Sequence, residues 1–261
     1  MQSSDLYSPR HADFYDAVHG TYVADAAFYL KMTKKYPGPL LEIACGTGRV
    51  GMPLIEQGAN YLGLDASPGM LARFRKRWEA SGRAGMPPLV QGDMRRFSLG
   101  RKFQLILITF NSLQHIHTDH EVLEVFAHCR EHLLEGGRLF FDVFNPDRRF
   151  LDRDPGKRYP VEKFLDEARG EWCNLTESNS YDPATQVNHI RWFARYENGE
   201  EGSFRLEMRQ FFPQEMDALV EAGGLRMLNK WGDFVGSGFS AASPRQVYKC
   251  AAASILKWPQ K

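Results

Sequence analysis

Three acidic residues occupy the ends of three short apolar segments in the N-terminal part of the 261-residue chain. They are Glu42, Asp65 and Asp93, and the turn Gly46–Gly48 follows the first of them. Because glycine has no Cβ, such a turn lets the backbone approach a nucleotide-like ligand closely. Carboxylates at the carboxyl ends of parallel strands can accept hydrogen bonds from the hydroxyl and amino groups of that ligand. The pattern predicts a nucleotide-type cofactor site at one edge of a parallel sheet.

The glycine turn permits two interpretations. Gly46–Gly51 fits the G-x-G-x-x-G fingerprint of dinucleotide-binding proteins, so an NAD-linked oxidoreductase is one alternative. Glu42, four residues before the first glycine, argues against it, because a carboxylate would face the pyrophosphate. A cofactor that carries a cationic sulfonium and an ammonium group tolerates an acid there. Asp65 does not discriminate, because NAD proteins also place an acid at the second strand end.

The spacing Glu42-x-Ala44-x-Gly46-x-Gly48 resembles the first motif of the class I S-adenosylmethionine-dependent methyltransferases, with Ala44 in place of the usual first glycine. This resemblance implies that S-adenosylmethionine is the cofactor. It also implies that Asp65 binds both ribose hydroxyls, that Asp93 accepts the adenine amino group, and that the next residue covers the ring. The cofactor-binding residues expected on this basis are Tyr15, Glu42, Ala44, Gly46, Gly48, Asp65, Ala66, Met70, Asp93, Met94 and Phe110.

The segment Tyr15-Asp16-Ala17-Val18-His19 is similar to the Tyr-Asp-x-x-His segment of sugar-amine N,N-dimethyltransferases. In that family the tyrosine closes over the carboxylate of the cofactor's methionine moiety, and Tyr15 is the matching position. His19 is a candidate substrate residue without an assigned role. The structural alternative for Tyr15 is a half-buried aromatic residue on an amphipathic helix.

Polar residues follow the almost continuously apolar strand Phe103–Ile108. Ligands of open α/β sheets bind at this carboxyl edge. In the methyltransferases that the chain resembles, this segment lies beside the transferable methyl group, and the resemblance implies that Phe110 and Asn111 line the sulfonium pocket. His115 is the candidate catalytic residue, because an imidazole titrates near neutrality and can act as an acid or base. An equally good alternative is that His115 only forms a hydrogen bond within a loop. Asn145, near the next strand tip, is a candidate substrate residue, whereas Asp142 is expected to be buried structure.

A second histidine pattern invites a metal interpretation. Residues 115–120 spell H-x-H-x-D-H, which resembles the zinc motif of metallo-β-lactamase-type hydrolases, and His189 is a further candidate ligand. However, the closing histidine and the glycine pair that follows this motif are both missing. Thr118 and Glu121 have the spacing of a helix capping box, so we expect a helix start and no metal site.

Apolar periodicity predicts alternating strands and helices, and therefore a doubly wound, Rossmann-like α/β fold with right-handed crossovers. We expect seven strands, mostly parallel, with an antiparallel last strand. The expected elements after the first strand and the glycine turn are a helix over Val50–Gln57, a strand over Tyr61–Asp65, a helix capped by Ser67, strands over Pro88–Gln91 and Phe103–Ile108, a helix over Glu121–Leu134, a strand over Arg138–Phe144, a helix over Pro213–Gly223, and strands over Leu225–Trp231 and Gln246–Ala252; a helix over Tyr22–Lys35 precedes them.

The pattern changes after the fifth strand. Three segments over Glu171–Ser180, Gln186–Tyr196 and Ser203–Phe212 read as antiparallel strands joined by turns. We therefore expect residues 1–146 and 213–261 to form the cofactor-binding domain, and residues 147–212 to form a small β-rich subdomain that covers the substrate. Trp172, Trp192 and Phe193 are equally suited to a pocket wall and to the sheet core.

Composition narrows the class of partner. Lysine and arginine number 33 and aspartate and glutamate 32, and the chain has no strongly basic block, which disfavours a nucleic-acid substrate. The cluster Arg73–Arg77 is expected to be a solvated helix face. The apolar runs are too short to span a bilayer, and Met1–Arg10 lacks an apolar signal core. The four separated cysteines indicate reduced, buried thiols, so we expect a cytoplasmic protein; the sequence leaves its oligomeric state open.

These observations favour an S-adenosylmethionine-dependent enzyme that methylates a small molecule, at nitrogen rather than oxygen. Displacement at a sulfonium methyl needs no protonation of the leaving group, so alignment and desolvation of the nucleophile carry the reaction. A non-catalytic S-adenosylmethionine-binding module is a further alternative that the sequence barely separates from the enzyme.

Overall fold

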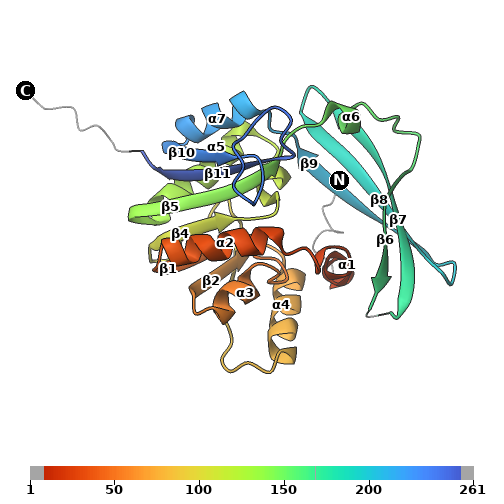
Figure 1. Cartoon of the computed structure of the whole chain (residues 1–261), viewed down its shortest axis with the longest axis horizontal. Coiled ribbons are helices and arrows are strands. Elements are labelled where there is room, and N and C mark those ends of the chain that lie inside the picture. The colour runs from red at the N-terminus through yellow and green to blue at the C-terminus, as the bar shows by residue number, and fades with distance from the viewer. Residues whose placement is uncertain (1–8, 168, 254–261) are drawn as a thin grey trace, which may run out of the picture.

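A computed structural model describes residues 9–167 and 169–253 of the chain. A seven-stranded sheet forms its centre, with the strand order β10-β11-β5-β4-β1-β2-β3 (Figure 1). Its strands are β1 (Pro39–Ile43), β2 (Asn60–Asp65), β3 (Leu89–Gln91), β4 (Phe103–Ile108), β5 (Leu133–Phe144), β10 (Leu225–Trp231) and β11 (Arg245–Ala252). Neighbouring strands from β3 to β5 run parallel, and β11 runs antiparallel to both β5 and β10. The expected Rossmann-like fold with an antiparallel last strand is confirmed.

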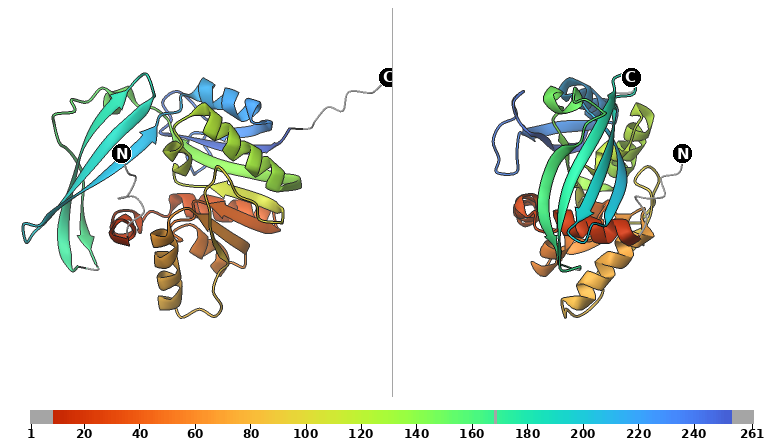
Figure 2. Two further views of the ribbon diagram at one scale, coloured as in Figure 1. Left: turned by 180° about the vertical axis from the view of Figure 1, so that it is seen from behind. Right: turned by 90° about the vertical axis from the view of Figure 1, so that its right-hand side faces the viewer.

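Helices cover both faces of this sheet (Figures 1 and 2). One face packs against α2 (Ala24–Lys35), α3 (Gly51–Glu56) and α4 (Pro68–Ala80), and the other against α5 (Asp119–His132) and α7 (Pro213–Ala222). The central strands are therefore buried on both sides, which explains the continuous apolar run of β4. The strand β5 begins at Leu133, earlier than the expected Arg138, because Leu133 already pairs with Phe103 of β4.

Side chains fix two helix starts as the sequence predicts. The Ser67 hydroxyl accepts a hydrogen bond from the Met70 backbone N–H, and Pro68 occupies the first turn of α4. At α5, the Thr118 hydroxyl accepts from the Glu121 N–H. Both caps lie at the edge where the parallel strands end.

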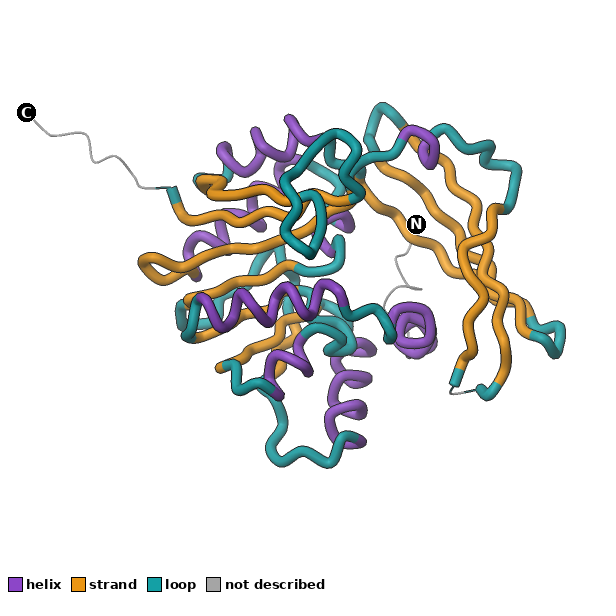
Figure 3. Tube along the Cα trace, in the orientation of Figure 1, coloured by secondary structure: helices purple, strands orange, loops and turns teal. Residues whose placement is uncertain are grey.

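A second, four-stranded antiparallel sheet follows β5, in the order β6-β7-β8-β9 (Figure 3). Its strands are β6 (Tyr159–Asp166), β7 (Glu171–Asp182), β8 (Val187–Tyr196) and β9 (Glu201–Arg209), and the short helix α6 (Arg148–Leu151) precedes them. The sequence predicted only three of these strands. The missed strand, β6, is an edge strand whose side chains are mostly exposed and which contains Pro160, so it lacks the alternation that marks a half-buried strand.

The helix α1 (Pro9–His19) lies between the two sheets (Figures 1 and 2). Phe14 stacks on Phe204 of β9 with ring centroids 4.1 Å apart. On the other side of the helix, the Asp16 carboxylate accepts hydrogen bonds from Arg73 Nε (2.7 Å) and Arg77 Nη1 (3.1 Å) of α4. The expectation that Arg73–Arg77 is only a solvated face is therefore wrong for these two residues, because α1 brings an acid against them.

Cys45, Cys129, Cys173 and Cys250 are all free and buried, as expected. Within residues 9–167 and 169–253, every helix is too short or too polar to cross a bilayer. The sequence of Met1–Arg10 predicts no apolar signal core, but residues 1–8 of this segment lie outside the described residues.

Candidate cofactor and acceptor site

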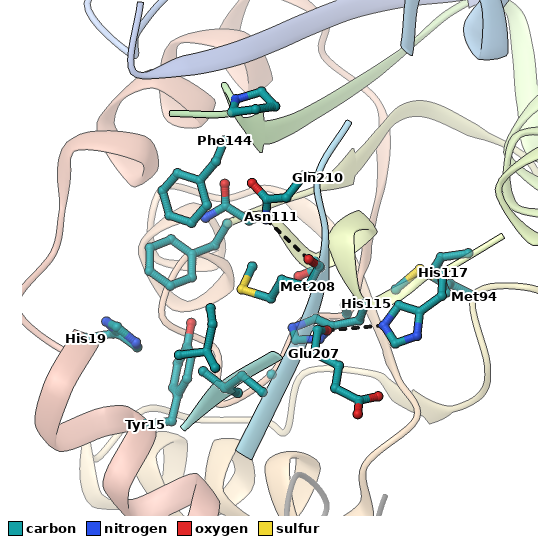
Figure 4. Close-up of a pocket in the computed structure, with 18 of the residues that line it drawn as sticks. Tyr15, His19, Met94, Asn111, His115, His117, Phe144, Glu207, Met208 and Gln210 are labelled. Carbon is teal, nitrogen blue, oxygen red and sulfur yellow. Dashed lines mark hydrogen bonds between the residues drawn. The ribbon is translucent and has the colours of Figure 1, made fainter. Parts of the chain in front are cut away.

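A pocket of about 1010 Å³ opens at the carboxyl ends of β1, β2 and β4 and extends to the second sheet. Figure 4 shows Tyr15, His19, Asn111 and His115 around the same space as Met208 of β9. Nearly all of the predicted site residues line this pocket: Tyr15, His19, Ala44, Gly46, Asp65, Ala66, Met70, Asp93, Met94, Phe110, Asn111, His115 and Asn145. The fold thus brings together residues from six separate stretches of the chain.

The glycine turn leaves open space beside the pocket. Gly46 has φ +56°, and a Cβ at this position would meet no atom within 4 Å. Its backbone N–H donates to Asp65 Oδ2 at 2.7 Å. Ala44 also has a left-handed backbone, with φ 55°, which costs a non-glycine residue roughly 1–2 kcal/mol. The turn is therefore held in a fixed shape although its first motif glycine is replaced.

Asp65 ends β2 with its carboxylate almost buried. Oδ1 accepts from the Ser67 N–H at 2.8 Å and Oδ2 from the Gly46 N–H. Burial raises the pKa of Asp65, and these two backbone hydrogen bonds oppose the rise. Each oxygen has a second lone pair, so Asp65 can fix the turn and still accept from two ligand hydroxyls.

Asp93 lies at the third strand end, where it forms an ion pair with Arg95. Arg95 donates through Nε to Oδ1 (3.0 Å) and through Nη2 to Oδ2 (2.6 Å), and also pairs with Glu121. The hydrogen bonds from Arg95 lower the pKa of Asp93. Asp93 is consequently an ionised acceptor at neutral pH, and Met94 lines the pocket beside it.

Two predicted cofactor residues, Glu42 and Gly48, lie outside the wall of this pocket. Glu42 is buried beneath the turn, where it accepts from the hydroxyls of Tyr61 (2.6 Å) and Thr109 (3.2 Å). Burial raises its pKa to about 7, against the effect of these hydrogen bonds. A Cβ on Gly48 would come within 2.6 Å of the Phe74 ring, so this glycine allows α4 to pack closely. Both residues shape the floor of the site.

A buried ion pair that the sequence did not reveal supports the same floor. Arg49 donates to Asp25 through Nη1 (2.7 Å) and Nη2 (2.5 Å), and its guanidinium lies 4.2 Å from the centre of the Phe110 ring. Burial opposes the charged form of Arg49, but the hydrogen bonds that Arg49 donates to Asp25 help to raise its pKa above the usual range. Burial raises the pKa of Tyr15. Tertiary packing alone brings Asp25 of α2 next to Arg49 of the glycine turn. The spacing of these residues in the sequence therefore could not predict their ion pair.

The segment after β4 has a strained backbone. Phe110 and Asn111 have φ values of 54° and 62°. The buried Asp142 carboxylate accepts from their N–H groups at 2.9 and 3.2 Å, and from the Tyr29 hydroxyl at 2.7 Å. Arg245 donates to Asn111 Oδ1 at 3.0 Å. The expectation that Asp142 is buried structure is confirmed, and strain of this kind persists only where the surroundings impose it.

The polar candidates differ in their surroundings. His115 ends the short 3₁₀-helix η1 (Ser112–His115) and lines the pocket. The His19 ring lies 5.0 Å from Tyr15 and 5.1 Å from Phe110, measured between ring centres. Asn145 donates through Nδ2 to the carbonyls of the loop at residues 241–243, so its amide nitrogen ties that loop to β5.

Three histidines of the zinc-like pattern each contact glutamate: His117 and His189 contact the backbone and the side chain of Glu207, and His120 contacts Glu124. His117 Nε2 lies 3.2 Å from the Glu207 carbonyl, His120 is 3.7 Å from Glu124, and His189 is 3.2 Å from the Glu207 carboxylate. In the part of the chain that the structure describes, no three acidic, histidine or cysteine side chains gather as a metal-binding group.

Comparison with known proteins agrees with this geometry. Residues 40–137 match a family model described as a methyltransferase domain. The putative methyltransferase YqeM of Bacillus subtilis (strain 168) is 26% identical over 230 residues, covering 84% of this chain and 86% of that protein. The dTDP-3-amino-3,4,6-trideoxy-α-D-glucopyranose N,N-dimethyltransferase of Streptomyces venezuelae is 32% identical over 154 residues, which span 56% of this chain and 62% of the relative.

The chain is a class I S-adenosylmethionine-dependent methyltransferase. The CcbJ methyltransferase of Streptomyces caelestis has the same fold, with a TM-score of 0.77 and 24% identity over 88% of this chain and 96% of that one. The proteins named here are all methyltransferases, and the oxidoreductase alternative receives no support from them.

The residues of this methyltransferase fit S-adenosylmethionine as its cofactor. Open space beside Gly46, two free lone pairs on Asp65 and the ionised Asp93 offer the contacts that a ribose and an adenine amino group require. The individual contacts, including that of Tyr15 to the methionine carboxylate, stay predictions. The residues that fit the cofactor line the part of the pocket next to the main sheet, and the second sheet bounds the remainder.

Proposed function

We propose that this methyltransferase transfers a methyl group from S-adenosylmethionine to the nitrogen of a small amine, and that an amino sugar is the class of acceptor to test first. The observation that carries the proposal is the continuous pocket, which joins the acidic strand tips to a wall from the second sheet. A relative named as an amino-sugar N,N-dimethyltransferase supports nitrogen as the methylated atom.

We propose that residues 1–146 and 213–261 form the cofactor-binding domain. Residues 147–212, which contain the second sheet, form the subdomain that covers the acceptor. Ile190, Trp192, Leu206 and Met208 of β8 and β9 line the pocket opposite the strand tips. These apolar side chains exclude water, and exclusion of water favours a neutral amine over its ammonium form.

S-adenosylmethionine supplies an electrophilic methyl group on a sulfonium. The chain's own contribution is alignment, which can account for several kcal/mol of a displacement barrier. We propose that Phe110 and Asn111, fixed by Asp142, border the methyl group, that His19 and Asn145 contact the acceptor, and that His115 takes up the proton that the amine loses. We further propose that the enzyme is cytoplasmic, which its four free cysteines support. We also propose that it has no nucleic-acid partner.

The test is incubation of the protein and S-adenosylmethionine with dTDP-3-amino-3,4,6-trideoxy-α-D-glucopyranose and a panel of simple amines and phenols, followed by mass spectrometry. Transfer of one or two methyl groups to an amine is expected. Methylation of phenols alone would contradict nitrogen as the target. Binding of S-adenosylhomocysteine without turnover of any acceptor would instead favour the non-catalytic module.

A further inference from the structure

A single row of side chains crosses the second sheet at the pocket. The strand register places Glu177 of β7 opposite Tyr159 of β6 on one side and Trp192 of β8 on the other, and Trp192 opposite Phe204 of β9. Glu177 is thus an acid among three aromatic residues, and both it and Trp192 line the pocket. The reaction as described above makes no use of this acid.

Two donors hold the Glu177 carboxylate in place. Arg153 Nη1 donates to Oε1 at 2.8 Å and Trp192 Nε1 donates to Oε2 at 3.0 Å. The Arg153 guanidinium lies 4.6 Å from the ring centres of both Phe150 and Tyr159. The Glu177 side chain is only 12% exposed, so its orientation is set by the protein rather than by solvent.

The location of Glu177 assigns it to the acceptor end. The Trp192 ring lies 5.6 Å from His19, whose ring in turn lies 5.1 Å from Phe110. Trp192 and His19 thus form a chain of contacts between Glu177 and the segment after β4. Asp65 and Asp93, which fit the cofactor, are at the opposite sheet.

The chemistry of the pair selects a kind of ligand group. Arg153 balances the charge of Glu177, so the pair has little net negative charge. What it offers to a ligand is the free lone pairs of the carboxylate. A carboxylate accepts about four hydrogen bonds, and protein donors account for two of them. Such a group suits a neutral donor, namely a hydroxyl. Ile190 and Leu206 of the same wall are apolar, so a ligand hydroxyl placed against them would lose its hydrogen bond.

We propose that Glu177 is a specificity-determining residue that accepts a hydrogen bond from a hydroxyl group of the methyl acceptor, and that Arg153 and Trp192 position its carboxylate. This inference rests on the proposed function. A site built to bind a hydroxyl discriminates strongly against an analogue without one, because its polar groups are then left unpaired.

The test compares wild type, E177Q and the control E197Q, with dTDP-3-amino-3,4,6-trideoxy-α-D-glucopyranose as the acceptor. Glu197 lies in a turn of the same sheet and is exposed, so its substitution changes charge equally without touching the pocket. E177Q should raise KM for the acceptor about tenfold or more, with the Kd for S-adenosylhomocysteine within about twofold of wild type. E197Q should change neither.

A second variant protects the test against misfolding of E177Q. W192F retains the carboxylate and an aromatic ring but removes the N–H that holds Oε2, so it should raise KM by a smaller factor. An unchanged KM in a folded E177Q, with an active wild type, would overturn this inference alone. A wild type that binds S-adenosylhomocysteine but neither binds nor methylates the amino sugar would overturn the amino-sugar proposal, and this inference with it.

Discussion

The two sheets of this methyltransferase handle charge in different ways. At the tips of the seven-stranded sheet, five charged side chains are at most 8% exposed: Asp25, Glu42, Arg49, Asp65 and Asp142. The four-stranded sheet buries fewer charges, namely Asp166 and Arg209, and several of its ion pairs, such as Arg158–Glu201, are open to solvent. Buried charges keep one arrangement because any other leaves them unpaired, whereas exposed pairs can exchange for water.

The difference matches two tasks. A cofactor that is the same in every turnover benefits from a rigid, pre-organised site. An acceptor wall built from aromatic contacts, as between Phe14 and Phe204, is held by packing and can vary in sequence without disturbing the strand tips. We therefore expect substitutions in the first region to alter stability and cofactor binding, and those in the second to alter acceptor use.

The largest expected effect is at the buried ion pair. D25N leaves the Arg49 guanidinium without its partner, which should lower the free energy of unfolding by about 3–5 kcal/mol. E201Q, which breaks an exposed pair in the second sheet, should lower it by about 1 kcal/mol or less. Urea unfolding of both variants checks the comparison, and equal losses would contradict it.

A pH dependence should follow from Glu42. Its pKa rises from 4.5 to about 7 on folding, so between these values the native state holds a proton that the unfolded chain has released. The free energy of unfolding should therefore fall by about 3 kcal/mol as the pH rises from about 4.5 to 7, and should lose this dependence in E42Q. Unfolding of wild type and E42Q at a series of pH values measures it. Parallel curves for the two proteins would exclude Glu42 as the titrating group.

The next effect concerns cofactor affinity. D65A removes the acceptor proposed for the ribose hydroxyls and also releases the Gly46 N–H, so affinity for S-adenosylhomocysteine should fall by about 2–3 kcal/mol. D65N preserves the shape of the side chain and should lose less. Calorimetric titration gives both values, and an unchanged Kd in D65A would refute the assignment.

The smallest effect is expected where the two regions meet. Asp16 joins α1 to α4 through Arg73 and Arg77, and Tyr15 beside it lines the pocket. D16N weakens this junction and should reduce S-adenosylhomocysteine affinity roughly tenfold, about 1.4 kcal/mol. D13N is the control, because Asp13 pairs with Arg73 at an exposed position. A loss of equal size in D13N would show that general charge, and not the junction, is responsible.

The sequence predicted the first region better than the second. Strands such as β4 are buried on both faces and therefore read as apolar runs, and the acids at their tips follow directly in the chain. The exposed edge strand β6 has no such period. The ion pair Asp25–Arg49 and the row through Glu177 join residues that only tertiary packing brings together, so local spacing could not reveal them.

The surroundings of Glu42 differ from what the sequence motif suggested. Glu42 was expected at the cofactor, but its hydrogen bonds go to Tyr61 and Thr109 beneath the turn. The acid at this motif position was predictable; its burial depends on β2 and β4 flanking β1, which the sequence pattern did not specify residue by residue.

The most direct test of the central claim is calorimetric titration of the purified protein with S-adenosylhomocysteine, with NADH as the comparison. We predict micromolar binding of S-adenosylhomocysteine and no heat of binding with NADH. Binding of NADH without binding of S-adenosylhomocysteine would contradict the account, and the glycine turn with its acidic neighbours would then serve a dinucleotide.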